Sequence, residues 1–222
     1  MDAKEIAARS AVAAIESGMI LGLGSGSTSL RAVQVLGERL QHEELSVIAV
    51  PTSVATEREA RAQGIPLATL EEQPALDLTV DGADQVDEHL NCIKGYGGAL
   101  VREKIVARCS ERLLIMVDPS KLSPVLDKPV PVEVLPFAWS VAWRRLVDLG
   151  GHPQMRHLDN QPYLTDNGNY ILDVMFGRID DPAALAARIA LQPGVIDHGL
   201  FVDLVHELHV GEPSGARVIR RR

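Results

Sequence analysis

The sequence predicts an α/β protein with a doubly wound, mostly parallel sheet and a small α+β unit after it. Apolar, β-branched runs alternate with amphipathic helical stretches over residues 1–128. A glycine- and serine-rich turn joins the first such run to the next helix. After residue 128 the alternation gives way to a helix, a hairpin signal, a second helix and a strand.

The first part of the chain supplies the alternating elements. A helix is expected over residues 3–17, because Ala7, Ala11 and Ile15 recur on one face and Gly18 follows as a stop signal. The expected order after it is a strand at 19–23, a helix at 29–41, a strand at 45–50, a helix at 53–63, strands at 65–70 and 76–80, a helix at 99–110 and a strand at 113–118. Short turns between alternating strands and helices predict parallel strands with crossover connections.

The remainder of the chain predicts the second unit. Residues 129–137 contain three prolines, which favours an edge segment or a linker because proline has no N–H to donate. The elements expected next are a helix at 138–149, a hairpin over 163–176 around Asn167-Gly168, a helix from Asp181-Pro182 to about Leu191, a strand within 194–202 and two strands within 206–220 that return to the first sheet. We therefore expect one domain from residues 1–128 and 204–222, and another from 129–203.

Composition limits what the chain can bind. A hydrophobic content of 46% supplies a core, and a net charge of −8 argues against nucleic acid or an anionic membrane as partner. No run of about 18 apolar residues is present, and charges such as Glu5, Arg9 and Glu16 interrupt the N-terminal helix where a signal peptide would be apolar. Cys92 and Cys109 match no metal or redox spacing, so we expect free thiols in a cytoplasmic protein.

The turn after the first strand has the character of a phosphate-binding loop. Its sequence GLGSGST (residues 22–28) opens a helix, so backbone N–H groups and the positive end of the helix dipole are available to an anion. Ser25, Ser27 and Thr28 add hydroxyl donors, and Gly26 lets backbone approach a ligand. The spacing is not that of a dinucleotide-binding loop, and the P-loop lysine is missing, which favours a phosphate monoester. The alternative is a tight turn in which Ser27 or Thr28 only caps the helix.

Residues 81–104 combine acids and a cation in one short segment. Asp81 and Asp84 follow the apolar run 76–80, so they are expected at the carboxyl end of a strand, where open α/β sheets bind ligands. Lys94 lies in a glycine-rich loop, and Glu103 follows that loop at the start of a helix. This combination is typical of a catalytic site for a small molecule.

Each of these residues also has a simpler interpretation. Asp84 could be only a turn or cap residue, Lys94 a solvated surface lysine, and Glu103 an exposed helix charge. The catalytic interpretation is favoured because all the simpler ones would have to hold together.

Several motifs together resemble the type A ribose-5-phosphate isomerases. They are GLGSGST (22–28), VDGAD (80–84), KGYGGALVREKIV (94–106), DPSK (118–121), VPVEVLPFAW (130–139), TDNGNYILDV (165–174), PGVIDHGLF (193–201) and VGEPSGARVI (210–219). The resemblance therefore covers nearly the whole chain. In this chain Tyr96 interrupts the run of glycines that usually follows the family's lysine.

The resemblance implies a Rossmann-like catalytic domain with a smaller ferredoxin-like lid domain, assembled as a homodimer or larger. It implies interconversion of ribose 5-phosphate and ribulose 5-phosphate without metal or organic cofactor. Glu103 would move a proton between C2 and C1, while Asp81, Asp84 and Lys94 would act on the sugar hydroxyls, ring opening and the developing oxyanion. The residues implied to bind substrate are Ser25, Gly26, Ser27, Thr28, Asp81, Gly82, Ala83, Asp84, Lys94, Gly95, Tyr96, Gly97 and Lys121.

Two other classes of function stay open on the sequence. A sugar-phosphate deaminase or a CoA transferase could use a similar sheet, and a CoA transferase would use a carboxylate such as Glu103 as nucleophile. A non-catalytic sugar-phosphate sensor would need a DNA- or partner-binding module. Because the N-terminal helix leads directly into the first strand, no helix-turn-helix is expected.

Overall fold

The computed structural model describes residues 2–221, and the chain forms two compact units. The first unit comprises Met1–Ala83, Arg102–Leu122 and Leu204–Arg222. The second comprises Asp84–Val101 and Ser123–Asp203. Each unit is built from segments that are distant in the sequence.

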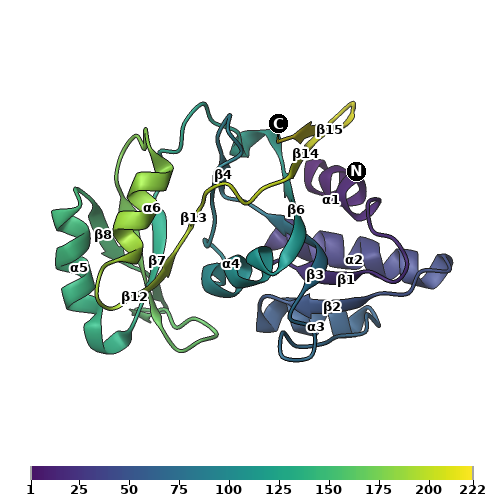
Figure 1. Ribbon diagram of the computed structural model, residues 1–222, viewed down its shortest axis with the longest axis horizontal. Coiled ribbons are helices and arrows are strands. Elements are labelled where there is room, and N and C mark those ends of the chain that lie inside the picture. Colours follow the sequence, from purple (N-terminus) through teal and green to yellow (C-terminus); the bar gives the residue numbers. More distant parts are fainter. Residues whose placement is uncertain (1, 222) are drawn as a thin grey trace. The chain divides into compact units, whose positions relative to one another are not determined.

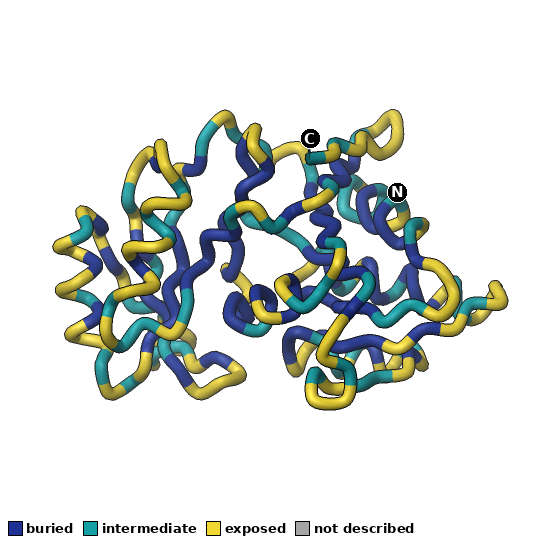
Figure 2. The backbone as a smooth tube through the Cα atoms, in the orientation of Figure 1, coloured by how far each residue is buried: buried dark blue, intermediate teal, exposed yellow. Residues whose placement is uncertain are grey.

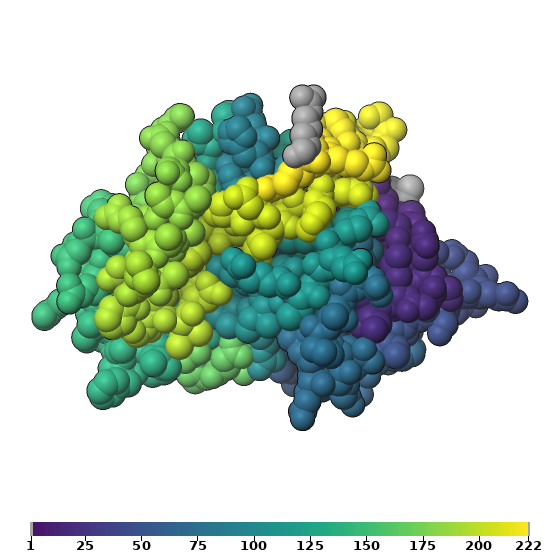
Figure 3. Space-filling model, in the orientation of Figure 1, coloured from purple at the N-terminus to yellow at the C-terminus, as the bar shows by residue number. Residues whose placement is uncertain are grey.

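The first unit is built on a six-stranded sheet with the order β15-β14-β6-β3-β1-β2 (Figure 1). Its strands are β1 (Ile20–Leu23), β2 (Ile48–Pro51), β3 (Leu76–Gly82), β6 (Ser110–Val117), β14 (Glu207–Glu212) and β15 (Gly215–Arg220). All pair in parallel except β15, an exposed edge strand seen in yellow on the surface in Figure 3. The central strands β3 and β6 are mostly buried (Figure 2), which explains their continuous apolar runs. The predicted doubly wound parallel sheet is confirmed.

Helices cover both faces of this sheet. They are α1 (Ala3–Val12), α2 (Ser27–His42), α3 (Val54–Ala62) and α4 (Leu100–Arg108). Leu21 and Leu23 of β1 share a core with α1, α2 and α3. Gly22 points to the opposite face, where a Cβ would lie 2.5 Å from the Val106 side chain of α4. Across residues 2–221, no helix has both the length and the apolar character needed to cross a membrane.

The chain reverses its winding direction beside β1. β1 lies between β2 and β3, so the chain leaves β1 through α2 to one side and later returns on the other as β3. Such a topological switch point is where open α/β sheets bind ligands. The carboxyl ends of β1, β3 and β6 carry the GLGSGST loop, Asp81 and the DPSK segment. The fold thus gathers three of the motifs at one edge of the first sheet.

The second unit contains a four-stranded antiparallel sheet with the order β12-β7-β11-β8. Its elements are β7 (Val130–Val134), α5 (Trp139–Asp148), β8 (His152–Met155), β11 (Tyr170–Met175), α6 (Pro182–Ala190) and β12 (Val195–His198). This βαββαβ order is the ferredoxin-like arrangement. The buried valines of β7 form a core with Leu146 of α5 and Ile189 of α6, so the predicted ferredoxin-like unit is confirmed.

The structure assigns two segments differently from the sequence-based domain boundaries. The sequence places residues 84–101 and 123–128 in the first domain, whereas both belong to the second unit. β5 (Cys92–Ile93) pairs with β13 (Leu200–Phe201) and with β4 (Gln85–Val86) in a small three-stranded sheet. The Gln85 side chain also bonds Asp127 twice, at 2.6 and 2.9 Å. These pairings between distant segments leave no local signal in the sequence.

α1 ends earlier than the sequence predicts. The expected helix reaches residue 17, whereas α1 stops at Val12. Nη1 of Arg39, on α2, donates to the carbonyls of Val12 (2.7 Å) and Ile15 (3.0 Å). These bonds satisfy carbonyl groups that a helix end leaves unpaired. The buried Ile15 side chain stays in the core while the chain turns toward β1.

Two predicted strands are wrong. Residues 65–70 make only one bridge, between Leu67 and Ala49, because Pro66 has no N–H with which to extend the ladder. Residues 163–169 form a turn instead of the first arm of a hairpin. The strand after that turn, β11, pairs with β7 and β8, which are remote in the sequence.

The position of β7 also differs from the prediction. The prolines of residues 129–137 predict an edge segment, but β7 lies between β12 and β11. Pro131 is accommodated because the paired register with β12 ends at Val132. Beyond that point the Pro131 carbonyl accepts a hydrogen bond from the Gly199 N–H at 2.7 Å, so on this side no donor is needed from residue 131.

A buried histidine on β14 ties pH to stability in the first unit. His209 is only 3% exposed, with Nδ1 2.8 Å from Ser10 Oγ and Nε2 3.7 Å from Glu207 Oε2. Arg112 and Arg220 pair with the same Glu207. Burial lowers the pKa of His209; Glu207 opposes this shift, and the two arginines add to it.

We predict that the free energy of unfolding decreases as the pH falls through about 6.5, the pKa of an unfolded histidine. Below that pH the unfolded chain binds a proton that folded His209, with its lowered pKa, does not bind. His209→Gln should flatten this dependence, whereas His42→Gln, at an exposed position, should keep it. Urea unfolding at several pH values measures the slopes, and parallel curves for wild type and His209→Gln would contradict the assignment.

Candidate functional site

The GLGSGST loop presents an uncapped helix N-terminus. α2 begins at Ser27, and its N-cap is Gly26, whose φ of +89° favours glycine. No side chain caps this end, and both Gly26 and Ser27 are exposed. The N–H groups of the first turn are therefore available to an anion, and the helix dipole favours negative charge there. The alternative that Ser27 or Thr28 caps the helix is wrong.

A lysine that the sequence analysis missed reaches this loop. Nζ of Lys4, on α1, donates to Ser27 Oγ at 2.9 Å. The Ser25 hydroxyl instead lies 2.7 Å from Thr52 Oγ1, so it helps to hold the loop in place. Lys4 belongs to no motif and lies 23 residues from Ser27, so only the packing of α1 could reveal it.

Asp81 joins the GLGSGST loop to the end of β3. It is 1% exposed, and its Oδ1 accepts from the Ser25 N–H (3.2 Å), the Ser29 hydroxyl (3.0 Å) and the Gly82 N–H (2.7 Å). A Cβ at residue 24 would lie 1.9 Å from that oxygen, so Gly24 is the glycine that close approach requires. β3 runs to Gly82, which places Asp81 inside the strand's end and Ala83 just after it. The sequence expected both aspartates beyond the strand.

A second lysine, in the segment after β6, shares a charged neighbour with Lys4. Lys121 ends a short 3₁₀ helix (Pro119–Lys121) whose N-cap is Asp118. Burial raises the pKa of Asp118, but hydrogen bonds from Ser120 and the charges of Lys121 and Lys4 outweigh it, so the pKa lies below its usual value. Both lysines therefore act on one carboxylate.

Glu103 occupies the first turn of α4 and is buried. Its exposed fraction is 3%, so the interpretation as an exposed helix charge is wrong. A carboxylate near a helix N-terminus is stabilised by the helix dipole. Lys104, the next residue, is also buried at 5%. Two adjacent buried charges are unusual for a helix that only supports the fold.

Lys94 is buried in the second unit. It is 2% exposed, its N–H donates to the Gly199 carbonyl at 2.8 Å, and its Nζ lies 5.2 Å from the centre of the Phe201 ring. The interpretation as a solvated surface lysine is therefore wrong. A cation over an aromatic face is stabilised by the ring quadrupole while it stays charged. The small sheet of β4, β5 and β13 holds Lys94 at the end of β5.

Residues 94–98, here called the glycine loop, are fastened to Asp84. Asp84 Oδ2 accepts the Tyr96 N–H at 3.0 Å, which is a loop contact and not a helix cap. The Tyr96 hydroxyl donates to the Pro129 carbonyl at 3.2 Å; burial and the nearby Asp84 raise its pKa to about 12. A Cβ at Gly95 or Gly98 would strike protein atoms, whereas Gly97 is exposed and faces open space. Close approach of a ligand is thus possible at Gly97.

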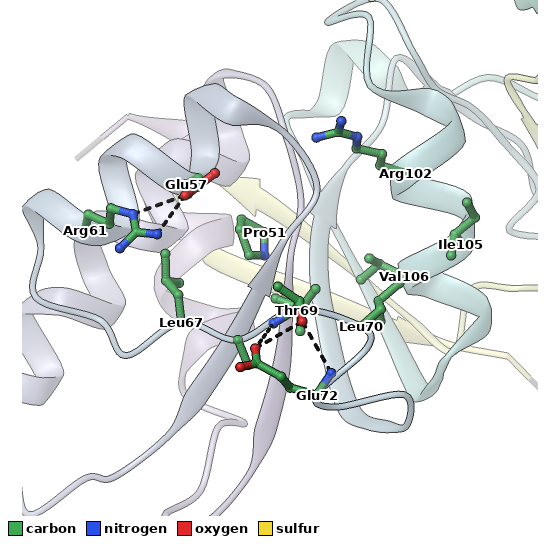
Figure 4. Close-up of a pocket in the computed structure, with 12 residues that line it drawn as sticks. Pro51, Glu57, Arg61, Leu67, Thr69, Leu70, Glu72, Arg102, Ile105 and Val106 are labelled. Carbon is green, nitrogen blue, oxygen red and sulfur yellow. Dashed lines mark hydrogen bonds and ion pairs between the residues drawn. The ribbon is translucent and has the colours of Figure 1, made fainter. Parts of the chain in front are cut away.

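A hollow of about 460 Å³ in the first unit contains none of the expected site residues. Figure 4 shows paired Glu57 and Arg61 of α3 on one side and Arg102 and Ile105 of α4 on the other. Its floor is apolar, and its rim carries both signs of charge. The sequence-predicted residues lie instead at the carboxyl ends of the first unit's strands, in the first turn of α4, and in the second unit at Asp84 and the glycine loop.

Comparison with known proteins identifies the family. The family described as ribose 5-phosphate isomerase A (phosphoriboisomerase A) matches residues 48–215. The chain belongs to this family. A ribose-5-phosphate isomerase A from Thermomicrobium roseum is 52% identical over 99% of this chain and 94% of its own length.

Solved structures of ribose-5-phosphate isomerases have the same fold. The enzyme from Methanocaldococcus jannaschii superimposes with a TM-score of 0.93 at 39% identity, covering 98% of this chain and 97% of its own. A D-ribose-5-phosphate isomerase in complex with phospho-erythronic acid gives a TM-score of 0.95 at 38% identity, with full coverage of both chains. The resemblance expected from the motifs is confirmed.

We predict that Lys4→Met weakens the binding of inorganic phosphate by roughly tenfold or more, the effect of losing a hydrogen bond to a charged group. Isothermal titration calorimetry measures the affinity. Arg58→Met is the control, because it removes an exposed charge from α3 of the same unit. Equal affinities for wild type and Lys4→Met would show that Lys4 does not serve the phosphate loop.

Proposed function

We propose that this chain interconverts D-ribose 5-phosphate and D-ribulose 5-phosphate through an enediolate. The observation that carries the proposal is the full-length match to a D-ribose-5-phosphate isomerase that binds phospho-erythronic acid, a phosphorylated sugar acid. The arrangement of Lys4, Lys121 and the open start of α2 supports the binding of a phosphate monoester. Deaminase, CoA transferase and sensor functions have no comparable support.

In the proposed reaction Glu103 acts as the base. It takes the proton from C2 of the open-chain aldose; the C2–H electron pair forms the C1–C2 double bond, and the carbonyl π pair moves to O1, which gives the enediolate. Transfer of the C2 hydroxyl proton to O1 and return of the proton from Glu103 to C1 then give the ketose. A buried carboxylate suits this role because it can be positioned against both carbons.

Lys94, Asp81 and Asp84 are proposed to act on the oxygens of the same substrate. Negative charge develops on the enediolate, and a preorganised ammonium group stabilises it most when water is excluded. Lys94 meets this condition because it is buried yet supported by the Phe201 ring. Asp81 and Asp84 would accept hydrogen bonds from sugar hydroxyls and assist ring opening.

We further propose that the chain works as a cytoplasmic homodimer without metal or cofactor. Among residues 2–221 no group of three His, Cys, Asp or Glu side chains is placed to hold a metal ion. Cys92 is buried and Cys109 half-buried, and both are thiols, which suits a reducing compartment. Size-exclusion chromatography with light scattering tests the oligomeric state.

A ketose-forming assay tests the function directly. Ribose 5-phosphate, glucose 6-phosphate and free ribose are compared as substrates, with and without EDTA, and acetyl-CoA with an acceptor acid is the alternative reaction. We expect turnover of ribose 5-phosphate that survives chelation. CoA transfer without any turnover of ribose 5-phosphate would favour the transferase. Loss of turnover on chelation that a divalent ion restores would indicate a metal-assisted route.

We predict that Glu103→Gln lowers kcat by roughly 10²- to 10⁴-fold with little change in KM, because the amide keeps the shape but cannot accept the proton. Steady-state kinetics with ribose 5-phosphate measures both constants. Glu111→Gln, an exposed carboxylate of the same unit, is the control and should behave as wild type. Near-normal turnover in Glu103→Gln would refute the assigned base.

We predict that Lys94→Met lowers kcat and kcat/KM together by roughly 10²- to 10³-fold, as when one oxyanion stabiliser is removed. Lys94→Arg should not restore the rate, because a planar guanidinium does not fit where a compact ammonium is enclosed. The same kinetic assay applies. A variant that only raises KM would make Lys94 a ground-state contact.

A further inference from the structure

Arg156, between β8 and β11, ties the glycine loop to the second unit's main sheet. Its side chain is only 15% exposed. Nε and Nη2 donate to Asp173 Oδ2 (2.9 Å) and Oδ1 (2.5 Å) on β11. Nη1 donates to the carbonyls of Gly95 (2.9 Å) and Tyr96 (3.1 Å). One guanidinium thus connects a carboxylate in a rigid strand to two consecutive carbonyls of the glycine loop.

These two carbonyl contacts also determine where the loop's N–H groups point. In a planar trans peptide the N–H is directed opposite to the C=O. With the Gly95 and Tyr96 carbonyls turned toward Arg156, the N–H groups of Tyr96 and Gly97 point away from it. The Tyr96 N–H indeed meets Asp84 Oδ2 at 3.0 Å. The Gly97 N–H has no hydrogen-bond partner within residues 2–221, and Gly97 is exposed.

Arg156 is itself fixed from a second direction. The Tyr163 ring lies 5.9 Å from the guanidinium carbon, and the Tyr163 N–H donates to the Arg156 carbonyl at 2.9 Å. The same ring fills the space at Gly98, where a Cβ would lie 2.2 Å from the Tyr163 hydroxyl. The turn after Tyr163 is held by the fully buried Glu133, whose Oε1 accepts from Thr165, Asn167 and Asn169. The guanidinium therefore has little freedom to move.

We propose that Arg156, held by Asp173, is a positioning residue for the isomerase reaction, an inference that rests on the function proposed above. It acts through the glycine loop, without touching substrate: it aims the Gly97 N–H at an oxygen of the reacting carbons. It also holds the loop that begins at Lys94 in one conformation. A preorganised N–H donor is most effective where charge develops in the transition state. Loss of Arg156 should therefore change mainly kcat.

The test compares Arg156→Ala, Arg156→Lys and Asp173→Asn in the full chain with ribose 5-phosphate as substrate. We expect Arg156→Ala to lower kcat roughly 10- to 100-fold with little change in KM, the effect of misplacing groups that orient the reaction. Arg156→Lys should stay impaired, because an ammonium cannot bridge Asp173 and two carbonyls at once. Asp173→Asn should show a smaller loss of the same kind. Added guanidinium ion, below denaturing concentration, should partly restore kcat in Arg156→Ala, whereas ammonium at equal ionic strength should not.

Arg178→Ala is the matched control, because Arg178 pairs with Asp180 on the surface of the same unit. A fall in the melting temperature of Arg156→Ala without a fall in kcat would overturn the proposal, as would a change confined to KM. If Arg156→Ala does not fold, Asp173→Asn decides, and an unchanged kcat in that variant overturns the proposal.

A second readout does not depend on catalysis. In the Arg156→Ala chain, amide hydrogen exchange at Tyr96, whose N–H is bonded to Asp84, should be faster by about tenfold or more. The loop can then open without breaking any contact to Arg156, so its opening costs less free energy. Unchanged exchange at Tyr96 would overturn the positioning role. A wild-type chain without isomerase turnover, but with the increase in Arg156→Ala, would instead refute the proposed function and leave the loop contact established.

Discussion

The hydrogen bonds to one oxygen of Asp81 are the interaction on which the candidate site residues of the first unit depend. A buried carboxylate is stable only when donors surround it. Here the donors come from the GLGSGST loop, the first turn of α2 and the end of β3 itself. The hydrogen bonds that stabilise Asp81 therefore also hold the GLGSGST loop beside the ends of β1 and β3. The absence of a side chain at Gly24 is the steric condition for this contact.

In the second unit, the polar backbone groups of the glycine loop also need hydrogen-bond partners. This loop has two glycines with positive φ, at Gly95 and Gly98, and such backbone is not held by regular secondary structure. The N–H groups of Lys94 and Tyr96 and the carbonyls of Gly95 and Tyr96 are bonded instead to Gly199, Asp84 and Arg156. Each contact comes from a different segment of the unit. These contacts hold the loop in one conformation although it is neither helix nor strand.

Residues 81–103, which contain the four candidate catalytic residues, belong to both units. The chain enters the second unit between residues 83 and 84 and returns to the first between residues 101 and 102. Asp81 and Glu103 therefore belong to the first unit, and Asp84 and Lys94 to the second. Each unit buries its own charged groups with local partners: Asp81 with loop amides, Lys94 with the Phe201 ring. The charged groups of the proposed proton transfer are thus buried separately within each unit's fold.

The sequence by itself determined the alternating elements, the GLGSGST turn before a helix and the choice of Asp81, Asp84, Lys94 and Glu103 as candidate residues. These follow from apolar runs and turn residues that lie within a few positions of one another, so a short stretch of sequence is enough to predict them. The tertiary structure alone decided the central place of β7, the early end of α1 and the contacts of Lys4 and Arg156. Lys4 meets a partner 23 residues away, Arg39 one 27 away and Arg156 one 61 away. Such contacts depend on how helices and sheets pack, which no local pattern encodes.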